Sequence, residues 1–161
     1  DGGETWSKVP YVITHTPPPS GSYLITVHGA NANEVWAVGR DQIIRVSVTA
    51  NGIRATDQTP KFGGGYDING IFAVNQKTVW AVADNSVIWR SVNGGKGWKE
   101  RSPQGAGYVF RVYALDKRHA WATTGDYSGH GQVLYTADGG KNWVPQSIPA
   151  NPEMWGISFV K

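Results

Sequence analysis

Three short apolar segments share one pattern and predict β-strands. Each contains a tryptophan followed by alanine, and they span residues 35–39, 79–83 and 120–124. Trp80 follows Trp36 by 44 positions, and Trp121 follows after 41 more. Residues 79–82 are continuously apolar instead of alternating with polar residues, which is typical of a sheet buried on both faces. Further apolar segments precede the tryptophan strands and follow the last repeat, at 23–27, 68–74, 109–115 and 154–160.

A glycine-rich turn follows the second and the third tryptophan strand, at 91–98 and 136–143. An Asp or Asn side chain accepts backbone N–H bonds in such a turn, and glycine supplies the positive φ. The N-terminus, at 1–6, resembles the end of another copy, and a degenerate copy is expected at 49–52. We assign a structural role to Asp1, Trp6, Ser91, Asn93, Trp98, Thr136, Asp138 and Trp143. Because indole has a large apolar area, Trp6, Trp98 and Trp143 are expected to be largely buried.

The repeating unit therefore has four short strands in about 40 to 45 residues, which is the size of a propeller blade. The sequence predicts an all-β fold, a single partial β-propeller domain of four-stranded antiparallel blades. Full blades are expected at 22–60, 66–104 and 107–149. Residues 1–13 are expected to be the last strand of a preceding blade, and 153–161 the first strand of a following one. Such a stack would close by self-association or with missing blades of a longer chain.

The turn pattern [ST]-x-[DN]-x-G-x-x-W at 91–98 and 136–143 resembles the Asp-box, or BNR repeat. This repeat occurs in sialidases, in xyloglucan-cleaving glycoside hydrolases, in sortilin-type receptors and in photosystem II assembly-factor-like propellers. The Trp-Ala-Val-Gly strand before the box is most similar to the last group and its uncharacterised bacterial relatives. The resemblance implies a β-propeller in which the box is a structural hairpin remote from any active site.

The amino-acid composition and the charge argue against several classes of partner and ligand. The chain has 21 Gly and 8 Trp but only 17% charged residues, which favours turns and strands over long helices. Its net charge of +3 is scattered, with no basic run, so nucleic acid is not an expected partner. Cysteine is absent and the four histidines are far apart, so we expect no metal site and no cofactor. No apolar stretch predicts membrane insertion.

The chain opens at Asp1 within a motif and has no initiating methionine, which indicates an excerpted polypeptide. An extracellular or periplasmic location, as for a secreted protein, is expected.

Candidate ligand-binding residues lie where propeller ligands normally bind, on the loops at one end of the strands. An aromatic residue stands at the entrance to each first strand, where it would stack on a ligand such as a sugar or cover the ends of neighbouring blades. Polar candidates lie on the loops that join second to third strands. The full set is Tyr23, Arg40, Tyr66, Asp67, Tyr108, Asp126, Tyr127, His130 and Trp155.

The sequence is compatible with two functions. The favoured one is a non-catalytic scaffold that binds a protein or glycan partner. The alternative is a fragment of a glycoside hydrolase, xyloglucanase-like or sialidase-like, which needs two carboxyls about 5 to 10 Å apart. Asp67, Asp84 and Asp126 are the available carboxyls, but their separation is not determined by the sequence. Arginines 40, 90 and 111 lack the expected Arg-Ile-Pro setting, which counts against a sialidase, and we assign no catalytic residue.

Overall fold

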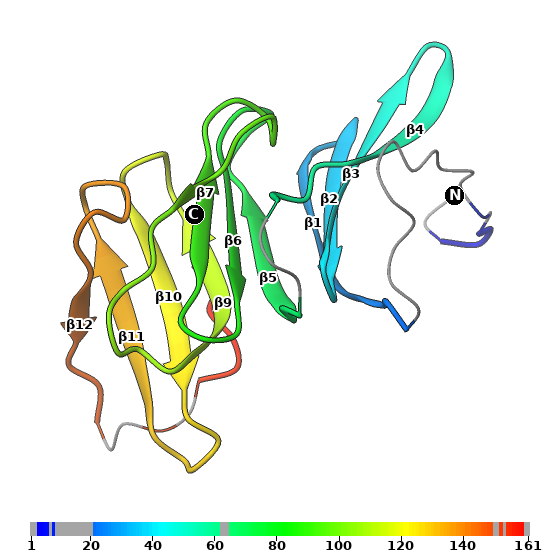
Figure 1. Cartoon of the computed structure of the whole chain (residues 1–161). Coiled ribbons are helices and arrows are strands. Elements are labelled where there is room, and N and C mark those ends of the chain that lie inside the picture. Colours follow the sequence, from blue (N-terminus) through cyan, green and yellow to red (C-terminus); the bar gives the residue numbers. More distant parts are fainter. Residues whose placement is uncertain are drawn as a thin grey trace.

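The computed structural model describes residues 3–6, 8, 21–61, 65–149, 152 and 154–159. These residues form three antiparallel sheets of four strands each and contain no helix (Figure 1). The first sheet comprises β1 (Leu24–Asn31), β2 (Glu34–Gly39), β3 (Gln42–Thr49) and β4 (Gly52–Asp57). The second comprises β5 (Ile68–Ala73), β6 (Val79–Ala83), β7 (Ile88–Ser91) and β8 (Lys99–Glu100). The third comprises β9 (Tyr108–Ala114), β10 (Ala120–Gly125), β11 (Gly131–Thr136) and β12 (Val144–Gln146).

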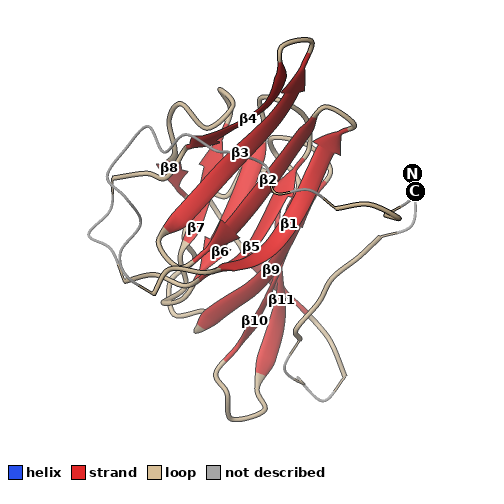
Figure 2. Ribbon diagram, turned by 90° about the vertical axis from the view of Figure 1, so that its right-hand side faces the viewer, coloured by secondary structure: helices blue, strands red, loops and turns tan. Residues whose placement is uncertain are grey.

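Each sheet is a meander, with its strands side by side in chain order. The second sheet lies between the other two (Figure 1), and the view turned by 90° shows the first sheet in front of the second (Figure 2). The all-β fold of four-stranded antiparallel blades is therefore confirmed. The strands fall within 22–60, 66–104 and 107–149. The division of the whole chain into blades and terminal strands stays a prediction, because Asp1 and most of 1–13 lie outside the described residues.

Most of the hydrophobic core lies in two layers between the sheets, and a smaller cluster lies on the first sheet. One layer joins the first and second sheets through Trp36, Ile43 and Ile68, and the other joins the second and third through Trp80 and Val109. The middle sheet contributes to both layers, so every residue of β6 is buried. This explains the continuous apolar run that the sequence shows at this strand.

The three strand tryptophans occupy the same register in their sheets, which confirms the repeat alignment. Trp36 pairs with Arg45 on the third strand, and Trp80 pairs in the same way with Arg90. Trp121 pairs with Tyr135. Each also faces an aromatic residue on the first strand, at 28, 72 or 113.

A row of aromatic rings crosses the stack on the first strands. The rings of His28 and Phe72 are 4.2 Å apart, and those of Phe72 and Tyr113 are 4.6 Å apart. Phe159 lies 4.8 Å from Tyr113 and extends the row. Residues 154–159 have no assigned strand, although a first strand is expected there. The segment thus packs on the third sheet in the position of a first strand without its backbone pairing.

Two expectations about the boxes are wrong. Residues 49–52 do not form a box but a tight hairpin, in which Thr49 pairs with Gly52 and β3 and β4 continue in register. The physical reason is that no tryptophan follows this turn to fold back over it. Trp6 is 90% exposed, because no described part of the chain covers its ring.

Candidate functional site

The turn at 136–143 is closed by hydrogen bonds to the side chains of Thr136 and Asp138. Thr136 Oγ1 accepts the Gly140 N–H at 2.9 Å, and Asp138 Oδ1 accepts the Asn142 N–H at 3.0 Å. Hydrogen bonds from the Asn142 backbone and side chain lower the pKa of Asp138 to about 2. The box at 91–98 repeats this arrangement. Asp138 is therefore a structural acceptor, as the sequence indicates for this position.

Each box joins its own sheet to the preceding one. The Trp98 ring stands edge-on to Trp36, with centroids 6.2 Å apart, and its Nε1 donates to the Gln58 carbonyl at 2.8 Å. Trp143 packs in the same way on Trp80 at 6.1 Å and donates to the carbonyl of residue 101 at 2.7 Å. Both box tryptophans are partly buried and pack against the core, in line with the burial expected from the sequence.

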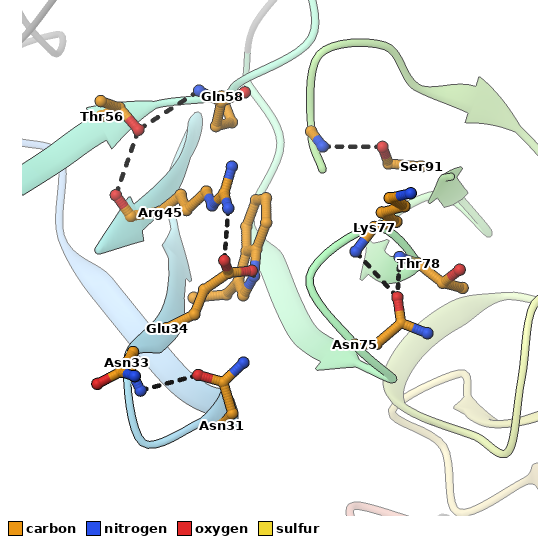
Figure 3. Close-up of polar contacts among 12 residues, drawn as sticks. Asn31, Asn33, Glu34, Arg45, Thr56, Gln58, Asn75, Lys77, Thr78 and Ser91 are labelled. Atoms are coloured by element: carbon orange, nitrogen blue, oxygen red, sulfur yellow. Dashed lines mark hydrogen bonds and ion pairs between the residues drawn. The ribbon is translucent and has the colours of Figure 1, made fainter. Parts of the chain in front are cut away.

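A buried ion pair lies beside the first of these junctions (Figure 3). Glu34 is only 2% exposed, and its Oε2 accepts a hydrogen bond from the Arg45 guanidinium at 2.5 Å. Its Oε1 accepts the Trp36 Nε1–H at 3.0 Å. The arginine lies over the Trp36 ring, 5.7 Å from its centroid. This pair was not predicted from the sequence, since nothing in the strand pattern distinguishes a buried glutamate from an exposed one.

Four of the predicted ligand-binding residues meet at the end of the first and second sheets. The Tyr23 hydroxyl donates to Asp67 Oδ1 at 3.0 Å, and Arg40 and Asp67 form a β-bridge. Tyr66 donates its N–H to the Asp41 carboxylate at 2.9 Å, and its ring packs edge-on against Trp89. These contacts close the ends of two neighbouring sheets, so Tyr66 covers the core.

The other aromatic candidates form an exposed cluster at the same end of the third sheet. Tyr108 and Tyr127 have ring centroids 4.6 Å apart, and Trp155 stacks on the buried Phe110 at 4.3 Å. Tyr127 and Trp155 remain 57% and 56% exposed. We call Tyr108, Phe110, Tyr127 and Trp155 the aromatic cluster. The sequence did not indicate Phe110, which lies beneath the others and supports them.

Asp126 and His130 flank the aromatic cluster on the β10–β11 loop. His130 Nδ1 lies 3.0 Å from Asp126 Oδ2, and Asp126 Oδ1 accepts the Ser128 N–H at 2.8 Å. The hydrogen bond from Ser128, followed by that from His130, lowers the pKa of Asp126. Both residues line a cavity of about 240 Å³ that also includes the glycine-rich segment 105–107.

The three carboxyls considered for hydrolysis each have a local partner. Asp67 accepts from Tyr23, Asp84 accepts from Asn69 Nδ2 at 2.8 Å, and Asp126 is held by its own loop. Within the described ranges, no group of three or more His, Cys, Asp or Glu side chains is arranged to hold a metal ion. The same ranges contain no helix long and apolar enough to span a membrane.

Known proteins resemble this chain in structure but not in a family model or a curated sequence. The sequence matches no protein-family model and no curated protein. The structure is similar to one titled "YCF48 bound to D1 peptide", with a TM-score of 0.64 and 20% identity over 79% of this chain and 42% of that one. It is also similar to YCF48 from Cyanidioschyzon merolae, with a TM-score of 0.60 and 23% identity over 80% of this chain and 38% of that one.

The chain thus spans about two fifths of the length of these two structures. Their likeness confirms, for the fold, the resemblance to β-propellers of the photosystem II assembly-factor group.

Proposed function

We propose that the chain is part of a β-propeller scaffold that binds a protein partner through its aromatic cluster. The observation that carries this proposal is the exposure of Tyr127 and Trp155, at 57% and 56%, above the buried ring of Phe110. Large rings held by a rigid support are the side chains that contribute most to protein interfaces. They would lose little conformational freedom on binding, because their neighbours already hold them.

A protein partner is favoured over a glycan. A structure similar to this chain is titled as bound to a peptide, the D1 peptide, which supports the same kind of ligand here. The hydrolase alternative lacks a matching observation, since Asp67, Asp84 and Asp126 each have a local hydrogen-bond partner. The scaffold is therefore proposed to be non-catalytic.

Isothermal titration calorimetry tests this function with the D1 peptide, a scrambled version of it and a xyloglucan oligosaccharide. We expect the D1 peptide alone to bind, and Tyr127→Ala or Trp155→Ala to weaken it by about tenfold or more, as for other interface aromatics. Ile53→Ala is the control, because Ile53 is 47% exposed on β4, away from the aromatic cluster. Binding of the oligosaccharide alone, or equal binding by all variants, would overturn the proposal.

Self-association is a second proposal, which rests on a different observation. Trp98 and Trp143 each pack on a strand tryptophan, whereas Trp121 contacts no box tryptophan among the described residues. Trp6 is the box tryptophan that is left exposed. We propose that Trp6 of one copy packs on Trp121 of another. Light scattering should show an assembly that Trp6→Ala abolishes, and a monomer at micromolar concentration would contradict it.

A further inference from the structure

A basic cleft lies between the second and third sheets, at the strand ends opposite the aromatic cluster. Its volume is about 720 Å³, and it is bounded by the β5–β6 and β9–β10 turns and the two boxes. One carboxylate, Asp138, lines it together with five cationic side chains, namely Lys77, Arg90, Lys117, Arg118 and Lys141. Both neighbouring sheets contribute cations, so the positive charge faces the cleft from two sides.

The repeat shows why this cleft is positively charged. At the junction of the first two sheets, Arg45 is neutralised by Glu34, which stands two residues before Trp36 (Figure 3). Arg90 is the equivalent arginine of the next junction, lying over the Trp80 ring at 5.4 Å. The residue two positions before Trp80 is Thr78, which has no charge. Arg90 therefore makes no ion pair with a described residue, and its guanidinium donates instead to the Lys117 carbonyl.

The carboxylate in the cleft does not compensate for the five cations. Asp138 accepts the Lys141 and Asn142 N–H groups of its own turn. The amines of Lys77, Lys117 and Lys141 make no ion pair within the part of the chain that the structure describes. Burial lowers the pKa of Arg90, nearby Arg101 lowers it further, and Asp138 opposes both effects without reversing the shift.

The shape of the cleft distinguishes between anionic ligands. A compact phosphate is usually cradled by free backbone N–H groups. Here the Gly139 N–H donates to the Arg118 carbonyl, and the Gly140 N–H donates to Thr136 Oγ1. The cations instead stand on long side chains around an open volume of about 720 Å³. This arrangement suits several carboxylates spaced along an extended chain.

We infer that this cleft binds an acidic peptide segment, with its carboxylates paired to the cations of both sheets. The proposal does not rest on the aromatic cluster, because that surface lies at the other end of the strands. The absence of a counterpart of Glu34 at position 78 is the feature that creates the site.

Fluorescence anisotropy with a labelled eight-residue peptide containing four glutamates, and with its glutamine counterpart, tests this inference. Thr78→Glu should weaken binding of the glutamate peptide by about tenfold, because the new carboxylate would neutralise Arg90 as Glu34 neutralises Arg45. A second variant, Lys77→Gln with Lys117→Gln, changes exposed side chains only and should also weaken binding. Lys99→Gln is the control, since it removes an exposed lysine outside the cleft.

The expected result is that only the glutamate peptide binds, and that added salt weakens it because ions screen exposed charges. Inorganic phosphate serves as the competing ligand. Equal binding of the two peptides, or unchanged binding by both cleft variants, would overturn the inference. Phosphate should displace the labelled peptide only at a higher concentration than the unlabelled glutamate peptide needs. If phosphate displaces it at a lower concentration, the cleft prefers a compact anion and the inference of an acidic peptide is wrong.

Discussion

Replacing Trp98 with alanine tests whether the box tryptophans hold neighbouring sheets together. A tryptophan has about 150 to 250 Å² of surface, so a half-buried ring removes roughly 100 Å² from water, worth about 2.5 kcal/mol. The lost hydrogen bond to the Gln58 carbonyl, 2.8 Å long, adds about 1 kcal/mol. We therefore expect Trp98→Ala to lower the free energy of unfolding by about 2 to 4 kcal/mol, near the lower part of the range for large core truncations.

The chain offers matched controls for this measurement. Trp143→Ala should cost a similar amount, because Trp143 makes the same contacts at the next junction. Trp6→Ala should cost less than about 0.5 kcal/mol at low protein concentration, since its ring is 90% exposed. Denaturant unfolding followed by circular dichroism measures all three. Equal losses of stability in Trp98→Ala and Trp6→Ala would contradict a packing role for Trp98.

Three further predictions concern the polar and glycine positions of the junctions. Glu34→Thr should lower the free energy of unfolding by about 3 kcal/mol, because it leaves a partly buried arginine without its anion; denaturant titration measures this. The pKa values of Asp116 and Asp138 are lowered to about 2 from 3.8, so both carboxylates stabilise the fold above pH 4. This contribution should be lost as the pH falls toward 2, and Asp138→Asn should reduce the pH dependence seen in acid titration. Gly95→Ala should lower the melting temperature more than Gly129→Ala. Both glycines have φ near +90°, so the backbone strain is similar, but only at Gly95 would the added Cβ lie 2.7 Å from a tryptophan ring of the neighbouring sheet.

The repeat made the fold predictable from the sequence. Trp36, Trp80 and Trp121 recur at nearly constant spacing, and constant spacing requires the same strand order in each unit. The hydrogen bonds of the boxes join residues of the same turn, so the backbone N–H groups that Asp138 accepts could be predicted from the motif. A degenerate copy was expected at 49–52 from its Asn and Gly, but without a following tryptophan these residues form a plain hairpin.

The surfaces were harder to predict, because they depend on contacts between sheets. Tyr66 and Trp155 occupy similar places in the repeat, yet one covers a core tryptophan and the other stays 56% exposed. The basic cleft follows from the difference between Glu34 and Thr78, whose effect depends on the arginine that faces each of them across the sheet. A lysine in each of the turns before Trp80 and Trp121 was the available signal for this cleft.

The direction of the box contacts gives the stack a polarity. At both junctions the later sheet extends its tryptophan backward, onto the strand tryptophan of the sheet before it. The earlier sheet also supplies the carbonyl that accepts the indole N–H. Damage to a box therefore exposes the core of the sheet that precedes it in the chain, while the sheet that carries the mutation keeps its own strand pairing. In a nearest-neighbour description of repeat stability, a mutation in a box therefore changes the interface energy of the junction on its N-terminal side.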